Sequence, residues 1–226
     1  LQGLRATGPS SPGARPRVRF ALVTMQIALT LALLGGSALL LRSLWNVVNV
    51  PLGFDAERVI TLTAELSSTK YPTPAHGAAF FEELLARAGA TPGAVSAALS
   101  DAAPPPRPPR GGWTNMGVDG RPADPAAPHP RIGIREVTPQ YFETFRIPLV
   151  KGRTFQEADW TGEPAVVLNE SAERILFAGE RALGRRIRPT PMPNGQWNRW
   201  YTVVGVTADI RNGQAVTDPP EPEIYV

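Results

Sequence analysis

The stretch RPRVRFALVTMQIALTLALLGGSALLLRSLW, residues 15–45, governs the interpretation of the whole chain. Arginines stand near both of its ends, and residues 20–41 between them carry no charge. As a helix, this uncharged run would be about 33 Å long at roughly 1.5 Å per residue. The hydrocarbon core of a bilayer is about 30 Å thick. The sequence therefore predicts a transmembrane helix over residues 20–41.

Two other interpretations of the apolar run remain open. A secretory signal peptide has an apolar region of about 7–15 residues and a cleavage site of the small-x-small type. The run here is longer, and it ends in three leucines and Arg42, which do not form such a site. A buried helix of a soluble protein is the third possibility. Length and the absence of charge favour a membrane-spanning helix over both.

The charges on either side of the apolar run predict its orientation. Residues 1–19 hold four arginines and no acidic residue, so this basic flank should stay in the cytoplasm. On the far side, Arg42 can extend its charged end to water, and Trp45 suits the membrane interface. We therefore predict a helix in the cell (inner) membrane, a membrane-proximal connector over residues 42–57, and an extracytoplasmic domain over residues 58–226.

Composition and motifs exclude several classes of function. Beyond the basic flank the chain has 19 basic and 20 acidic residues, without the clustered basic face of a nucleic-acid-binding protein. It has no cysteine, which excludes disulfides, thiolate metal sites and cysteine nucleophiles. His76 and His129 have no ligand-like spacing, and neither a G-x-S-x-G nor a P-loop motif occurs. We therefore expect no catalytic residue, metal site or cofactor, no nucleic-acid partner, and no enzyme activity.

A strand, a helix and a second strand are predicted at the start of the domain. In RVITLTAEL, residues 58–66, apolar and polar residues alternate as in a half-buried strand. Thr73 and Pro74 are suited to cap and to begin a helix over residues 75–88. AVSAALS, residues 94–100, has the composition of another strand. Together these segments predict a βαβ unit.

The remainder of the domain mixes strands and helices. Prolines cluster in a loop over residues 101–130, within which WTNMGVDG has the composition of a strand. AVVLN, residues 165–169, predicts a compact buried strand, and its last residue, Asn169, can cap a helix over residues 170–177. WYTVVGVTAD, residues 200–209, is apolar on both faces and predicts another buried strand. This mixture indicates an α+β fold.

Small residues recur along the predicted transmembrane helix. Thr24, Ala28, Ala32 and Gly36 are spaced four apart and so share one helix face. Such faces let membrane helices approach one another closely. Ala and Gly are also frequent in membrane helices without this role, which stays the alternative. We favour a helix-packing face whose partner is another transmembrane helix of the same protein or of a second copy.

The chain resembles the MacB-like periplasmic core domain with its preceding membrane helix, as found in FtsX/MacB-type ABC transporter permeases of the duplicated kind. The segments that carry the resemblance are, in order, ALVTMQIALTLALLGGSALLLRSLWNV, LGFDAERVITL, TPGAVSAALS, VTPQYFETFRIPLVKGRTFQEAD, AVVLNESAERILF, LGRRIR, YTVVGVTADIRNG and PEPEIYV. Two positions depart from it: Arg146 stands where the family often has glycine, and Ala178 where it often has proline. The family's later membrane helices do not follow, so we expect a fragment truncated at its C-terminus.

The resemblance implies a role without a catalytic site. In this family a separate cytoplasmic ABC ATPase subunit hydrolyses ATP, and the permease couples that cycle to its extracytoplasmic domain for export or mechanotransmission. The first membrane helix and its exit would then carry the motion. The alternative is a single-pass, membrane-anchored binding or sensor domain without an ATPase partner. Either protein would contact membrane lipid.

Overall fold

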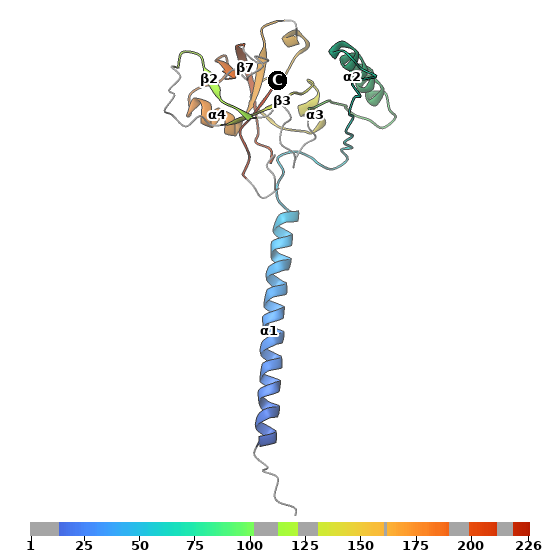
Figure 1. The fold of residues 1–226 in the computed structure, drawn as a ribbon. Helices are drawn as coiled ribbons and strands as arrows, with labels where there is room; N and C mark the ends of the chain where they lie inside the picture. The colour runs from blue at the N-terminus through green and yellow to red at the C-terminus, as the bar shows by residue number, and fades with distance from the viewer. Residues whose placement is uncertain (1–13, 102–112, 122–130, 161, 190–198, 212–218) are drawn as a thin grey trace, which may run out of the picture. The chain divides into compact units, whose positions relative to one another are not determined.

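The computed structural model describes residues 14–101, 113–121, 131–160, 162–189, 199–211 and 219–226. The chain divides into two compact units, Leu1–Val50 and Pro51–Val226 (Figure 1). The described part of the first unit is one long helix. The second contains a mixed α/β domain. This confirms the predicted α+β class with an apolar N-terminal helix.

The helix of the first unit, α1, runs from Ala14 to Val48. Among the described residues it is the one helix whose length and composition would allow it to cross a membrane, over Arg17–Val48. Its apolar side chains are exposed all around: Leu22, Leu33 and Leu41 are each more than 60% exposed. A helix that is apolar on every side is typical of a buried or membrane-embedded environment.

The second unit is organised by an eight-stranded mixed sheet. Its strands are β1 (Trp113–Thr114), β2 (Met116–Val118), β3 (Ile132–Arg135), β4 (Leu149–Gly152), β5 (Ala165–Asn169), β6 (Arg186–Pro189), β7 (Tyr201–Thr207) and β8 (Glu223–Tyr225). The order across the sheet is β1-β3-β8-β5-β7-β6-β2. Strands β3 and β8 are parallel, as are β5 and β7, and the other pairs are antiparallel.

Strand β7 is the centre of the sheet. Strand β5 pairs with it along one edge, whereas its other edge is shared between β6 near the start and β4 near the end. Gly205 of β7 lies against the backbone of Arg153, the residue that follows β4. A Cβ at Gly205 would lie 2.1 Å from the carbonyl oxygen of Arg153. Only glycine permits this close approach of the two backbones.

The domain has a hydrophobic cluster on each face of the sheet, and β5 is buried between them. Val166 and Leu168 point into a cluster closed by helix α4 (Glu170–Phe177). Val167, pointing the other way, belongs to a cluster formed with helix α3 (Tyr141–Thr144). A strand covered on both faces is apolar throughout. The predicted compact buried strand is thus confirmed.

The two helices predicted over residues 75–88 and 170–177 are confirmed almost to the residue, whereas α1 extends beyond the predicted residues 20–41 at both ends. Helix α2 runs from Pro74 to Gly89, and the Thr73 side chain accepts a hydrogen bond from the backbone N–H of His76. Helix α4 begins after Asn169, whose side chain accepts from the N–H of Ala172. In both cases the capping residue satisfies a backbone donor that the first turn leaves without a partner.

The two strands predicted around α2 are wrong. Residues 58–66 form no strand, and the side chains of Ile60 and Leu62 are 88% and 89% exposed. Residues 94–100 contribute only one isolated bridge, between Ser100 and Val137. Alternation specifies which residues would face a core, but a strand also needs a neighbour for its backbone hydrogen bonds. Among the described segments, residues 58–66 have no such neighbour, and residues 94–100 have one only at their end, where the N–H of Thr138 donates to the carbonyl oxygen of Leu99 (3.1 Å). The βαβ unit therefore does not form.

The proline-rich loop predicted over residues 101–130 lies largely outside the described residues. Its described part, residues 113–121, forms β1 and β2. Two further short elements lie in the described part of the domain: helix α3 and a 3-10 turn, η1 (Glu157–Trp160).

Candidate functional site

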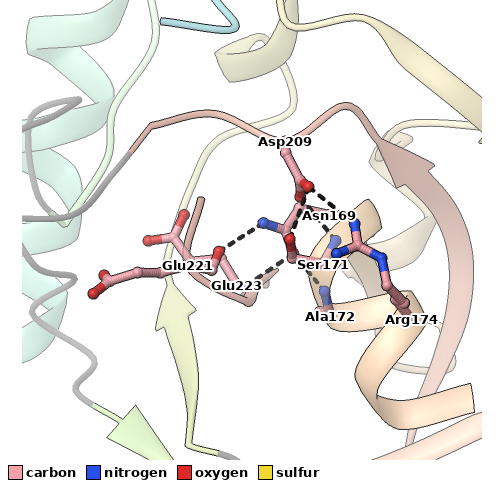
Figure 2. A network of polar contacts seen from close by, with 7 residues as sticks. All are labelled: Asn169, Ser171, Ala172, Arg174, Asp209, Glu221 and Glu223. Carbon is pink, nitrogen blue, oxygen red and sulfur yellow. Dashed lines mark hydrogen bonds and ion pairs between the residues drawn. The ribbon is translucent and has the colours of Figure 1, made fainter. Parts of the chain in front are cut away.

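A polar network joins the end of β5, the start of α4 and the chain after β7 (Figure 2). Its centre is Asn169, which is fully buried. The side-chain oxygen of Asn169 accepts from the N–H groups of Ala172 (2.9 Å) and Glu223 (3.0 Å), and its amide nitrogen donates to the carbonyl oxygen of Glu221 (2.8 Å). One side chain therefore caps a helix and fixes the start of β8.

Asp209 is the second member of this network. Its carboxylate accepts from the backbone N–H of Ser171 (2.8 Å) and from the Ser171 hydroxyl (2.7 Å). The guanidinium of Arg174 lies 3.5 Å from the same carboxylate. A negative charge at the first turn of a helix also interacts favourably with the helix dipole. Asp209 thus ties the segment after β7 to helix α4, as Figure 2 shows.

The residues directly after Asp209 hold the first residues of the domain. The backbone N–H of Arg211 donates to the carbonyl oxygen of Leu52 (2.9 Å), and its Nε donates to the carbonyl oxygen of Pro51 (3.2 Å). Gly53 lies against the same segment, with φ +83°, and a Cβ there would be 2.3 Å from the carbonyl oxygen of Asp209. Glycine is needed at this position for its conformation and for the close approach.

A second set of contacts holds the next two residues. The backbone N–H of Asp55 donates to the carbonyl oxygen of Phe145 (3.0 Å), and its carboxylate pairs with Arg146. The ring of Phe54 meets Phe145 edge to face, with centroids 5.9 Å apart. We call residues 51–55 the anchored segment, because backbone bonds, an ion pair and a ring contact all join it to the domain.

A buried ion pair joins strands β3 and β8, close to Asn169, which accepts from the N–H of Glu223. Arg135 on β3 and Glu223 on β8 are both fully buried and form two hydrogen bonds, of 2.7 and 3.3 Å. Burial raises the pKa of Tyr141 above its usual value, although the positive charge of Arg135 opposes this. Burial also raises the pKa of Tyr225, and the negative charge of Glu223 adds to the effect. Both tyrosines therefore stay neutral in the folded protein.

The four residues predicted to form a packing face all lie on α1. The helix places Thr24, Ala28, Ala32 and Gly36 on one side, and their side chains are exposed. A Cβ at Gly36 would have no neighbouring atom within 4 Å. Without a second helix the packing role is not tested, and it stays a prediction.

The described part of the chain shows no cluster of side chains that could bind a metal ion. No three His, Cys, Asp or Glu side chains come together there as ligands for a metal ion. His76 lies at the start of α2, with its Nδ1 2.7 Å from the Thr73 hydroxyl. His129 lies outside the described residues. The absence of enzyme activity, metal and cofactor stays a prediction.

The sequence interpretation missed both the anchored segment and Asp209. Gly53 between Leu52 and Phe54 was the available signal, since an isolated glycine often marks a close backbone approach. Its partner, the Asp209 carbonyl, is 156 positions further along the chain, so no local pattern connects the two.

The second unit matches a known protein family over most of its length. The sequence profile described as the MacB-like periplasmic core domain matches residues 109–226. Similar solved structures include the periplasmic region of MacB from Actinobacillus actinomycetemcomitans, with 24% identity over 50% of this chain and 42% of that one, at a TM-score of 0.35. Another is the extracellular domain of the ABC-type transporter YknZ from Gram-positive bacteria, with 20% identity over 52% and 55% of the two chains, at a TM-score of 0.33. No curated protein matches.

These findings identify the class of protein. A mixed α/β domain that follows one long apolar helix defines the architecture. Because the family profile covers more than half of the sequence, the chain belongs to the MacB-like periplasmic core domain family. It spans about half of the length of the solved structures that it resembles.

Proposed function

We propose that the chain is the membrane (permease) subunit of a MacB/FtsX-type ABC transporter. In this role it couples the cycle of a cytoplasmic ATPase to an extracytoplasmic domain, for export or mechanotransmission. Family membership and the long apolar helix support the proposal. The structural observation that most supports this proposal is the anchored segment, which begins three residues after α1 ends.

Transmission of a displacement requires that the moving helix be joined to the domain without slack. The chain is already held at Pro51 and Leu52 by Arg211, and again at Asp55 by Phe145 and Arg146. A flexible linker would instead absorb the movement in its own backbone torsions. The anchored segment is therefore suited to pass a movement of its own backbone to the residues that hold it.

The contacts continue from the anchored segment into the core. Arg211 follows Asp209, which binds the first turn of α4 through Ser171. Helix α4 in turn packs on the sheet through Leu176 and Phe177. Because packed cores shift between discrete arrangements rather than deform continuously, a movement at residue 51 would be communicated to the sheet as a whole.

The proposal includes an orientation. The basic residues 1–19 lie in the cytoplasm, α1 crosses the cell (inner) membrane, and the mixed domain faces the extracytoplasmic side. This follows from the positive-inside tendency. The chain itself contributes no catalytic residue and no cofactor, because ATP hydrolysis belongs to the partner subunit.

Orientation is tested by cysteine labelling in intact cells, and the absence of native cysteine makes the background clean. Ser10→Cys and Thr91→Cys are made separately and exposed to a membrane-impermeant maleimide. We expect labelling at position 91 only, and labelling at position 10 only after the membrane is permeabilised. The reverse pattern, or equal protection of both positions, would contradict the proposal.

The coupling role is tested with the P-loop ATPase that copurifies with the chain in a mild detergent. We expect the ATPase to hydrolyse ATP faster in the complex than alone. If no ATPase associates with the membrane-inserted chain, the permease role fails. The single-pass binding or sensor domain then becomes the better description.

A further inference from the structure

Four large side chains with polar atoms lie together on the side of the sheet that faces α3. Arg135 of β3 is paired with Tyr225 of β8, and Glu223 precedes Tyr225 by two residues on the same strand, so these three side chains share one face. Tyr225 belongs to the same hydrophobic cluster as Tyr141 of α3, with ring centroids 6.0 Å apart. We call Arg135, Glu223, Tyr141 and Tyr225 the buried polar cluster, because each residue is 0% exposed.

The two tyrosine hydroxyls of this cluster lack the partner that a buried polar group normally has. In the described part of the chain, neither the Tyr141 hydroxyl nor the Tyr225 hydroxyl makes a hydrogen bond, although both atoms are buried. A hydroxyl that leaves water without gaining a new partner destabilises the folded state. Phenylalanine would fill the same space without this cost. The hydroxyls therefore call for a partner that the described residues do not supply.

The carboxylate of Glu223 is close to both hydroxyls. Burial raises the pKa of Tyr141 and of Tyr225, and the negative charge of Glu223 raises it further, whereas the positive charge of Arg135 opposes this. Within the described structure, each carboxylate oxygen of Glu223 accepts one hydrogen bond from Arg135. A carboxylate oxygen can accept two, so Glu223 has acceptor capacity left. Opposite Glu223 on β3 is Gly133, which brings no side chain to this position.

These groups define the chemistry of a ligand that would fit among them. Each hydroxyl has a proton to donate, whereas Glu223 can only accept. Arg135 and Glu223 balance in charge, so the site favours neither a lone cation nor a lone anion. A small neutral molecule with two lone pairs and two protons meets these requirements, and water is such a molecule. One water would accept from both hydroxyls and donate to Glu223, which gives the three hydrogen bonds that buried waters typically make.

We propose that the buried polar cluster binds one ordered water molecule, which bridges Tyr141, Tyr225 and Glu223. The water would join α3 to strand β8. Phe145, directly after α3, packs its ring on Tyr141 with centroids 5.0 Å apart, and its carbonyl oxygen accepts from the N–H of Asp55 in the anchored segment. Through α3, the water would therefore connect the anchored segment to the buried ion pair. The inference depends on neither membrane insertion nor an ATPase.

A crystal structure of the whole chain in detergent, at a resolution where ordered waters are visible, tests the site directly. We expect one peak of electron density within hydrogen-bonding distance of both hydroxyls and of the Glu223 carboxylate. Well-ordered side chains without such a peak would overturn the proposal. Hydroxyls that bond directly to Glu223, or to another group of the protein, would overturn it as well.

Substitution of each tyrosine tests the site in solution. Tyr141→Phe and Tyr225→Phe keep the ring and remove one hydrogen bond to the water, so each should raise the equilibrium constant of unfolding roughly 3- to 10-fold in urea. A fall in this constant would show that the hydroxyls have no partner and would overturn the bridge. Tyr71→Phe is the matched control, because Tyr71 is half-buried and lies outside the cluster. It should change the constant by less than about 2-fold, and an equal effect in all three variants would also contradict the proposal.

A double variant tests whether both hydroxyls share one water. The fold-change of Tyr141→Phe with Tyr225→Phe should differ from the product of the two single fold-changes by at least about 2-fold. The contact between the two rings is kept in every variant, so it does not produce this difference. A double variant equal to the product would indicate independent sites and overturn the shared water. These measurements contain no partner protein, so this proposal and the permease role can fail separately.

Discussion

Two non-glycine residues, Arg146 and Ala178, adopt left-handed backbone conformations, which are uncommon for residues with a Cβ. Arg146 has φ +52° and Ala178 has φ +48°. Glycine adopts this conformation without the steric cost of a Cβ. Proline has φ fixed near −65° and would not fit at Ala178. At Arg146 the ion pair with Asp55 accompanies the strained conformation.

Ala178 gives a direct test of this strain. It caps the C-terminus of α4 and donates its backbone N–H to the carbonyl oxygen of Arg174. Ala178→Gly should raise the free energy of unfolding by about 1 kcal/mol, because glycine removes the left-handed penalty. Ala178→Pro should lower it, since proline loses both the conformation and the donor. Urea unfolding in detergent, followed by tryptophan fluorescence, measures both variants, and a stabilising proline would contradict the observed cap.

Gly53 is the residue on which the close contact with Asp209 depends. Gly53→Ala should lower the free energy of unfolding by at least about 2 kcal/mol. The new Cβ would clash with the Asp209 carbonyl oxygen, and alanine would also pay the cost of the left-handed backbone conformation. Gly93→Ala is the matched control: its φ is +87°, but no atom lies within 4 Å of the new Cβ. It should show the conformational penalty alone. Equal effects of the two substitutions in urea unfolding would argue against the tight contact.

Strands β3 and β8 are joined by the buried pair of Arg135 and Glu223 as well as by their backbones. Glu223→Gln should cost about 3 kcal/mol of stability, because it leaves the guanidinium buried without a compensating charge. Glu83→Gln breaks an exposed pair with Arg87 on α2 and should cost less than about 0.5 kcal/mol.

A double replacement distinguishes loss of the pair from loss of packing. Arg135→Met with Glu223→Leu removes both charges and should recover much of the stability lost in Glu223→Gln, since similar apolar replacements of buried pairs are often neutral. Thermal unfolding of all variants at one pH gives the comparison. A double variant less stable than Glu223→Gln would show that the pair itself stabilises the sheet.

Helices were predictable as elements because their signals are local. Thr73 and Asn169 each lie within three residues of the N–H groups that they cap, so sequence spacing was enough to place both helix starts. Strands depend on partners elsewhere in the chain. Residues 58–66 alternate regularly, yet without a paired neighbour they form no strand, and Ile60 and Leu62 stay exposed.

At the level of the whole molecule, the predicted packing face of α1 should determine how this helix associates with other membrane helices. Replacement of Ala32 and Gly36 by Leu should weaken helix association while leaving membrane insertion intact, because bulky side chains prevent close approach but remain apolar. Crosslinking through single cysteines introduced into α1 measures association, and stimulation of the partner ATPase measures the consequence. Ser37→Leu, on the opposite side of the helix, is the control. Unchanged crosslinking in the double variant would reject the packing face.

The amino-acid order alone determined the long apolar helix, the caps of α2 and α4, the buried strand β5 and the α+β class, because each rests on contacts within a few residues or on simple periodicity. The tertiary structure alone decided which strand-like segments pair, that Gly53 lies against Asp209, and that Arg135 meets Glu223. These contacts join residues far apart in the chain, and their free energy appears only once the sheet has brought the two sides together.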